Sequence, residues 1–217
     1  MFEQIIQEFK DNANAENALP MAKYMKNRFP YLGLSRPARN QIQAEFLKKA
    51  RKLPELNWEF VFRGWELPER EYQYLALDYL NACARLLRPE DITRMAVLIS
   101  AKSWWDTVDL IAARLVGGLC LKYPGLRDEY ILPWAADDNI WLARTAILFQ
   151  LKYKQSTDTG LLAQIIGLNL NSPEFFINKA IGWILREYSK TDKEWVRDFI
   201  KNTSLQPLSV REGGKYL

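Results

Sequence analysis

The chain has 217 residues, of which 48% are hydrophobic and 26% charged, and its formal net charge is +4. This composition is typical of a globular protein and excludes a disordered one. There is no histidine, which excludes imidazole acid–base catalysis, serine–histidine–aspartate triads and the common zinc sites. The two cysteines, Cys83 and Cys120, form neither a CxxC motif nor a disulfide framework. We therefore expect two buried thiols in a cytoplasmic protein without a metal centre.

Helical periodicity dominates the sequence, and no sustained alternation of apolar and polar residues predicts a strand. The breaks fall at proline, asparagine and aspartate residues. The N-terminus lacks the pattern of a signal peptide, and no apolar run is long enough to span a membrane. We predict one all-α domain over residues 1–217, with helices over residues 2–12, 17–28, 36–51, 56–65, 69–86, 89–101, 104–122, 125–136, 139–154, 158–169, 173–190, 192–201 and 207–216.

A repeat runs through the predicted helices. Windows of similar pattern begin at residues 69, 105, 141 and 176, which are 36, 36 and 35 residues apart. Each interval also contains a second helix. This spacing predicts a HEAT-like α-α superhelix, a right-handed solenoid with a concave face.

Two stripes recur in these windows at helical spacing. One is apolar and predicts the core, with Leu142, Ala146, Phe149, Ile177, Ile181 and Ile184. The neighbouring stripe mixes aromatic and charged residues: Trp105, Val108, Asp109, Ala112, Trp141, Arg144, Thr145, Leu148, Phe176, Lys179, Ala180 and Trp183. Cations and indole faces on one surface suit a nucleic acid. A basic cluster between residues 36 and 52 fits a solvated helix face equally well.

Several segments resemble a known family. They are MAKYMKN at 21–27, LPERE at 67–71, KSWWDTVD at 102–109, DNIWLAR at 138–144, FQLKYK at 149–154 and FFINKAIGWILREY at 175–188. Together they resemble the AlkD-type DNA alkylation repair glycosylases, which are built from HEAT-like repeats. The resemblance extends from about residue 2 to about residue 213.

The resemblance implies a function in base excision repair, with no metal or cofactor. Such an enzyme hydrolyses the N-glycosidic bond of cationic N3- or N7-alkylated purines, of the 3-methyladenine and 7-methylguanine type, in double-stranded DNA. Matching positions imply a catalytic role for Asp109, Trp105, Trp183 and Arg144. They imply DNA contacts for Tyr24, Lys152, Phe175, Phe176, Lys179 and Arg186. We expect a monomer that binds DNA in the cytoplasm, at the nucleoid. We do not expect it to bind a membrane.

The hydrolysis of such an N-glycosidic bond can be carried out by the residue types that this sequence contains. An alkylated purine cation leaves as a neutral base, so no general acid is needed and a chain without histidine suffices. The sugar gains oxocarbenium character, which a carboxylate stabilises. Trp105 and Asp109 are four residues apart and therefore share one face of a helix.

Each residue also has a structural interpretation when it is taken alone. Asp109 would be a surface charge, Trp105 and Trp183 core residues, and Arg144 and Lys152 solvated cations. Tyr24 would be a packing residue, and Phe175 and Phe176 a hydrophobic plug. We interpret Glu69, Arg70 and Glu71 as structural, and Asp106, Asp137 and Asp138 as helix caps or solvent charges.

A different class of function also stays open, that of a non-catalytic helical-repeat scaffold that binds damaged DNA or protein partners. A scaffold has no need of a carboxylate within a cationic surface, where it would weaken phosphate binding. Asp109 between two tryptophans therefore favours the enzyme.

We predict that the protein binds undamaged duplex DNA by charge, with little sequence preference, because lysine and arginine are abundant and no groove-reading motif is present. Affinity should fall steeply as salt is raised from low to moderate concentration in a fluorescence anisotropy titration. A flat salt dependence, or strong preference for one undamaged sequence, would contradict this.

Overall fold

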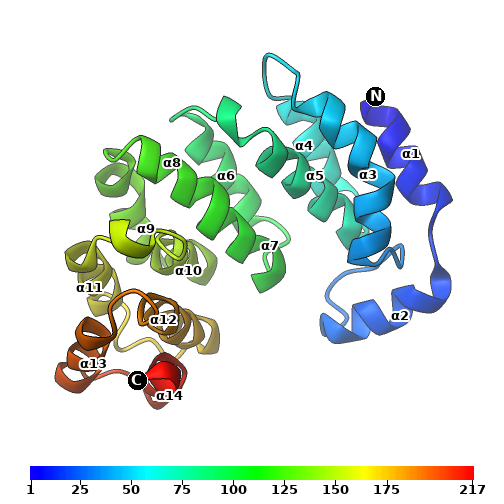
Figure 1. Cartoon of the computed structure of the whole chain (residues 1–217). Coiled ribbons are helices and arrows are strands. Elements are labelled where there is room, and N and C mark those ends of the chain that lie inside the picture. Colours follow the sequence, from blue (N-terminus) through cyan, green and yellow to red (C-terminus); the bar gives the residue numbers. More distant parts are fainter. The chain divides into compact units, whose positions relative to one another are not determined.

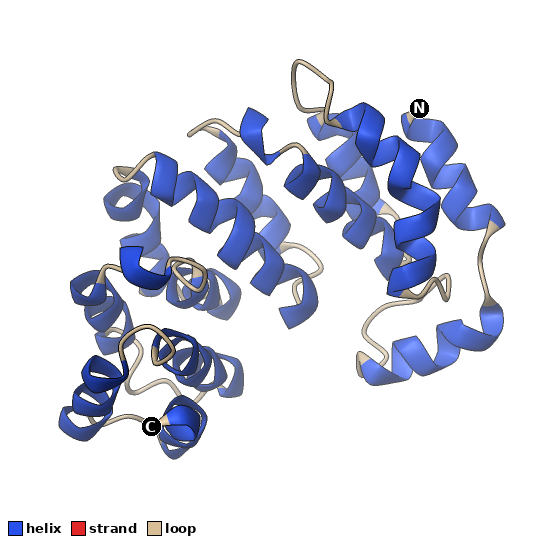
Figure 2. Ribbon diagram, in the orientation of Figure 1, coloured by secondary structure: helices blue, strands red, loops and turns tan.

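The computed structural model describes residues 1–217 and consists of helices and loops, with no strand (Figures 1 and 2). The chain forms two units, Met1–Leu87 and Arg88–Leu217. No helix has both the length and the apolar character that a membrane span requires. The all-α class predicted from the sequence is confirmed.

Many of the helices begin at a residue that the sequence marks. The side chains of Asn14, Ser35, Asn57, Asn139, Asp158 and Asp192 each accept a hydrogen bond from a backbone N–H of the turn that follows. These short polar side chains bind N–H groups that have no partner inside the helix. For this reason the predicted starts agree closely with the observed ones.

Unit 1 consists of α1 (Phe2–Asp11), α2 (Ala15–Tyr24), α3 (Arg36–Ala50), α4 (Trp58–Glu66) and α5 (Arg70–Ala82), followed by a 3-10 turn, Ala84–Leu86. Helix α5 packs against α3 and α4. The core is rich in aromatic rings: those of Phe2, Phe46, Phe60 and Tyr79 lie 4.7 to 6.0 Å apart. These contacts bury a large apolar area in a small unit.

Glu71 ties the loop before α3 to α5. Its buried carboxylate accepts hydrogen bonds from the backbone N–H groups of Leu32, Gly33 and Leu34, at 2.9 to 3.0 Å. Gly33 has a φ of +86°, and a Cβ at this position would lie 1.9 Å from the carbonyl oxygen of Asn14. Arg70 is fully buried beside the ring of Phe29. The structural interpretation of Arg70 and Glu71 is therefore confirmed.

Unit 2 begins with α6 (Asp91–Ser100), α7 (Trp105–Leu110), the π-helical turn η2 (Ile111–Val116) and α8 (Gly117–Lys122). A second π-helical turn, η3 (Arg127–Ile131), leads into α9 (Leu132–Ala135) and α10 (Ile140–Leu148). The unit ends with α11 (Thr159–Gly167), α12 (Phe175–Tyr188), α13 (Lys193–Asn202) and α14 (Pro207–Gly213).

Helix α10 is central in unit 2, since it packs against α6, α7, α9, α11 and α12. The contact between α8 and the end of α10 is especially close. A Cβ on Gly117 would lie 2.3 Å from the carbonyl oxygen of Phe149, and the Tyr153 hydroxyl donates to the Gly117 carbonyl at 2.7 Å. These contacts fix α7 and α8 against α10.

Most of the predicted core stripe is confirmed: Ala146, Phe149, Ile177, Ile181 and Ile184 are buried, whereas Leu142 is only half-buried. Both cysteines are fully buried, as predicted, and burial raises the pKa of the Cys120 thiol to about 12.

Four predicted helices end early. Those predicted over 69–86 and 207–216 end at Ala82 and Gly213, and each is followed by a 3-10 turn. The helix predicted over 139–154 ends at Leu148, because the side chain of Gln150 bonds both the N–H and the carbonyl of Asp158 in a turn. The helix predicted over 17–28 ends at Tyr24, because Lys26 and Asn27 adopt positive φ.

We predict that Glu71→Gln lowers the free energy of unfolding by about 1–3 kcal/mol, because the amide –NH₂ group would face backbone N–H groups and leave buried donors unsatisfied. Urea denaturation measures this. The matched control is Glu69→Gln on the neighbouring N-cap residue, which makes no side-chain cap bond. Equal unfolding midpoints for the two variants would contradict the role of Glu71.

Candidate functional site

A pocket of about 340 Å³ lies between α7, α10 and α12. Eight of the ten residues predicted from the sequence line it: Trp105, Asp109, Arg144, Phe175, Phe176, Lys179, Trp183 and Arg186. Residues from three successive repeats therefore converge on one place. This convergence is what the 36- and 35-residue spacing predicts.

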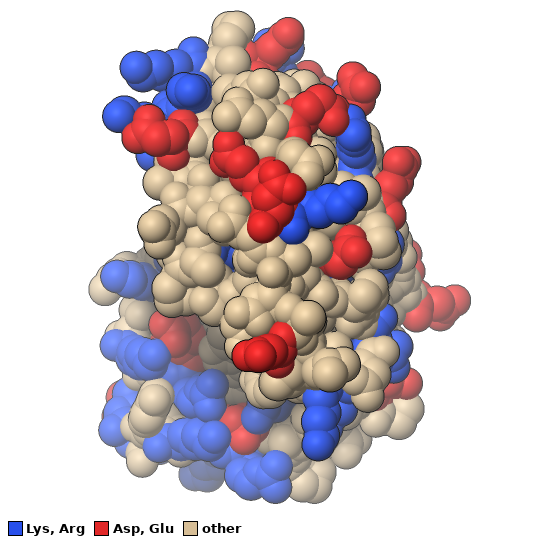
Figure 3. Space-filling model, turned by 90° about the vertical axis from the view of Figure 1, so that its right-hand side faces the viewer, with Lys and Arg blue, Asp and Glu red and all other residues tan.

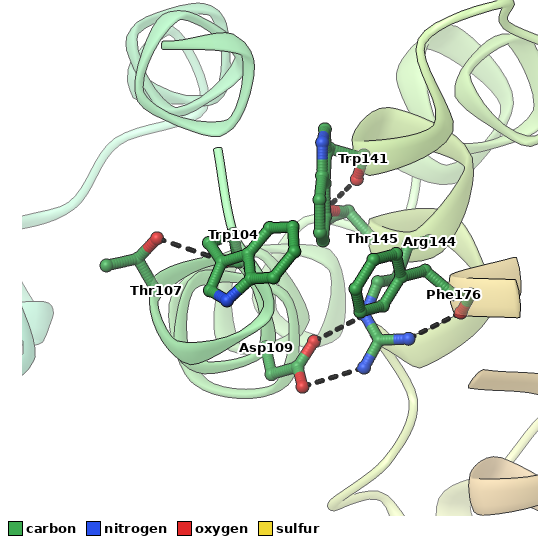
Figure 4. Close-up of polar contacts among 7 residues, drawn as sticks. All are labelled: Trp104, Thr107, Asp109, Trp141, Arg144, Thr145 and Phe176. Carbon is green, nitrogen blue, oxygen red and sulfur yellow. Dashed lines mark hydrogen bonds and ion pairs between the residues drawn. The ribbon is translucent and has the colours of Figure 1, made fainter. Parts of the chain in front are cut away.

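An ion pair between Asp109 and Arg144 forms the floor of the pocket (Figure 4). Arg144 donates from Nε to Oδ1 of Asp109 at 2.7 Å, and from Nη2 to Oδ2 at 2.8 Å. The third nitrogen of the guanidinium, Nη1, donates to the backbone carbonyl of Phe176. The arginine of α10 thus binds α7 and α12 at the same time.

The two side chains are mostly removed from water: that of Asp109 is 13% exposed and that of Arg144 is 4% exposed. Burial raises the pKa of Asp109 above its ordinary value, and the hydrogen bonds from Arg144 oppose the rise. Both oxygens of Asp109 accept bonds from a group that can only donate, which is the arrangement of an ionised carboxylate. The pocket therefore contains an ionised carboxylate in a fixed orientation, with the guanidinium of Arg144 as its counter-charge.

Three aromatic rings pack behind the ion pair. The ring of Phe176 lies 5.0 Å from that of Trp104 and 5.0 Å from that of Trp141, and the two indoles are 5.7 Å apart. Figure 4 shows these rings grouped beside Asp109 and Arg144. They shield one side of the ion pair from water, which strengthens its electrostatic interactions.

The open side of the pocket is aromatic and basic. Trp105 and Trp183 are half-buried, while Phe175 is 58% exposed. Lys179 and Arg186 lie on the same helix as Trp183, and both form ion pairs with Glu212 of α14. The Asp109–Arg144 ion pair is thus surrounded by indoles and further cations.

Two predicted DNA contacts do not line this pocket. Lys152 is exposed and lines another cavity, of about 360 Å³, together with Lys154 and Lys190. Tyr24 belongs to unit 1, where it is 72% exposed beside Tyr31 and Tyr74.

Unit 1 also carries a basic surface on and after α2. Lys23, Lys26 and Arg28 are exposed there. Figure 3 shows one face of the molecule, with lysine and arginine side chains more numerous in its lower half than acidic ones. The surface next to Tyr24 is therefore suited to a polyanion.

The structure corrects part of the sequence interpretation. Five residues of the mixed stripe are buried: Val108, Ala112, Thr145, Leu148 and Ala180. Much of this stripe is therefore an inner layer, and its exposed part includes the pocket. Arg144, taken alone, would be a solvated cation, but it is buried because Asp109 and Phe176 bind all three of its nitrogens. The sequence pattern gives no role to Trp104 or Glu212, and it places Trp141 in the mixed stripe without indicating that its ring packs behind the ion pair.

No group of three or more aspartate, glutamate, cysteine or histidine side chains is placed to hold a metal ion. Asp137 accepts a bond from the N–H of Asn139, which caps α10, so Asp137 supports the start of this helix.

The family model described as "DNA alkylation repair enzyme" matches residues 5–217. The chain is also similar to a solved structure described as a predicted DNA alkylation repair enzyme from Enterococcus faecalis. The two share 33% sequence identity with a TM-score of 0.86, over 94% of this chain and 96% of the other. No curated protein sequence gives a significant match.

We predict that Arg144→Leu lowers the free energy of unfolding by about 3 kcal/mol, because it leaves Asp109 as a buried charge without its partner. Adding Asp109→Asn should recover part of this loss. Urea denaturation of the two single variants and the double variant measures the coupling. The control is Arg114→Ala, an exposed arginine of η2, which should change stability little. Additive losses in the double variant would contradict the ion pair.

Proposed function

The chain belongs to the DNA alkylation repair enzyme family, and on this premise we propose that it is a monofunctional DNA glycosylase for cationic alkylated purines. Its role in DNA alkylation repair and its helical-repeat fold follow from the family and from the solved relative. The observation that carries the finer proposal is the fixed carboxylate of Asp109 in a pocket rimmed by indoles and cations. The substrate is double-stranded DNA that contains 3-methyladenine- or 7-methylguanine-type lesions.

Asp109 acts on the sugar. As the bond between C1′ and the alkylated base breaks, the positive charge of the base moves onto the deoxyribose. A carboxylate that is already in place stabilises this charge without reorganising, and it can orient a water for attack at C1′. The base departs with both electrons of the bond, which makes it neutral, so no proton has to be supplied.

Arg144 is a positioning residue for this reaction. Its two bonds to Asp109 fix the direction of the carboxylate, and its bond to the Phe176 carbonyl fixes the arginine itself. Trp105 and Trp183 present indole faces, which attract a cationic base or sugar by about 0.5–2 kcal/mol each. Phosphates next to the lesion are bound by Lys179 and Arg186. Further contacts with the DNA come from three exposed residues, Lys152, Tyr24 and Phe175.

This function needs neither metal nor cofactor, and a monomer contains every residue it uses. Alkylated chromosomal DNA in the cytoplasm is the natural substrate. A scaffold that only binds damaged DNA would use the cations and the aromatic residues in the same way, but it would need Asp109 only as the partner of Arg144 and not as a charge beside the sugar. The carboxylate therefore separates the two functions experimentally.

We predict that Asp109→Asn reduces single-turnover release of N7-methylguanine from duplex DNA by about 10²–10³-fold, because it removes the charge that stabilises the sugar cation. Its binding to a duplex with an abasic analogue should be unchanged or slightly tighter, because the lost charge repels phosphates. Quenched-flow release and anisotropy binding measure the two quantities.

The matched control is Asp106→Asn, which removes a carboxylate from the same helix but does not line the pocket. It should release the base at nearly the wild-type rate. Trp105→Ala and Trp183→Ala should slow release less than Asp109→Asn. A wild-type rate in Asp109→Asn would leave only the scaffold function, and loss of DNA binding in this variant would count against the catalytic role.

A further inference from the structure

Glu212 of α14 binds two of the cations that line the pocket, Lys179 and Arg186. Its Oε2 lies 3.0 Å from Nζ of Lys179, 3.0 Å from Nη1 of Arg186 and 3.0 Å from Nζ of Lys215. The glutamate side chain is 6% exposed, whereas those of the lysines and the arginine are 24% to 47% exposed. The anion is therefore inside, and its three partners reach from it toward solvent.

Two glycines allow this carboxylate to reach α12. A Cβ on Gly182 would lie 2.5 Å from Cβ of Glu212, so only glycine lets the two helices approach so closely at this point. Gly213 approaches Leu185 in the same way, with 3.1 Å between a Cβ placed on it and Cβ of Leu185. The close approach brings the Glu212 carboxylate within reach of both Lys179 and Arg186.

The charges of this cluster do not cancel. Three cations share one carboxylate, which leaves a net charge of +2 (3 − 1) beside the pocket. The hydrogen bonds from Lys215 and Lys179 lower the pKa of Glu212 to about 2, so the carboxylate stays ionised at neutral pH. Without it, Lys179 and Arg186 would lose their common partner and would spread over many side-chain rotamers.

We propose that Glu212 is a positioning residue, which holds Lys179 and Arg186 in a fixed arrangement that binds the phosphates flanking the lesion. This proposal rests on the proposed glycosylase function, whose DNA contacts it specifies further. Binding of α14 to α12 alone does not require the carboxylate. The Ser209 hydroxyl, which donates to the Asn178 carbonyl at 2.9 Å, and the glycine contacts already join the two helices.

The first test is Glu212→Gln, which keeps the shape and removes the charge. Single-turnover release of N7-methylguanine should slow about 10-fold, because the DNA is bound less precisely over Asp109. Affinity for a duplex with an abasic analogue should stay within about 3-fold of wild type, because the added positive charge offsets the lost order. The control is Glu194→Gln, an exposed glutamate of α13 paired only with its neighbour Arg197, which should leave both quantities unchanged.

The second test is a double-mutant cycle with Lys179→Gln. In the wild-type background, this change should weaken binding to the abasic-analogue duplex. In the Glu212→Gln background, the loss should be at least about 3-fold smaller, because the lysine is no longer held in place. A glutamate that only joined two helices would give equal losses in both backgrounds. Such additivity, or a wild-type release rate in Glu212→Gln, overturns the proposal.

A third variant, Glu212→Asp, keeps the charge and draws the cations toward α14. It should unfold near the wild-type temperature and still release the base more slowly than wild type. If Glu212→Gln does not fold, Glu212→Asp serves in its place to test whether Glu212 positions the cations. A wild-type rate in Glu212→Asp would then overturn the proposal. If the wild-type protein releases no base, the proposed function fails, and the binding cycle still decides the role of Glu212.

Discussion

The guanidinium of Arg144 binds three helices together, and the rest of the pocket depends on it. Its partners Asp109 and Phe176 lie 35 and 32 residues away in the sequence, one repeat to either side. A buried charge without a partner is strongly unfavourable, so α7, α10 and α12 pack in the way that gives Arg144 all three of its bonds. The same packing directs the carboxylate of Asp109 into the pocket. Stability and orientation of the site therefore have one physical cause.

The charges of the site form two layers with different surroundings. The inner pair of Asp109 and Arg144 is shielded by the rings of Trp104, Trp141 and Phe176, where electrostatic interactions are strong. The outer cations lie near solvent, where water and salt screen their attraction for phosphates. A polyanion such as DNA thus meets positive charge first, although one of the two inner groups, Asp109, is negative. The cations also offset the repulsion that Asp109 alone would exert on phosphates.

The sequence predicts the elements that obey local or periodic rules. The capping residues mark where helices begin, and the repeat spacing brings Asp109, Arg144 and Lys179 to the same stripe of successive repeats, because each repeat adds a similar rotation. It does not predict that Arg144 is buried, since its partner lies a repeat away. Nor does it tell which of Trp104 and Trp105 faces inward. Glu212 lies beyond the four repeat windows, so periodicity gives no indication of its role.

The composition of the pocket limits the bases that the proposed reaction can release. Asp109 is the only carboxylate among the lining residues, both of its oxygens accept bonds from Arg144, and the chain has no histidine. The Asp109 carboxylate is therefore poorly suited to protonate a departing base, and the ammonium group of Lys179 is bound by Glu212. An unmodified purine leaves as an anion unless it is protonated, whereas an N3- or N7-alkylated purine leaves as a neutral molecule. In the proposed reaction, undamaged DNA is therefore a poor substrate because its purines are poor leaving groups, and this selectivity does not require a pocket shaped to the lesion.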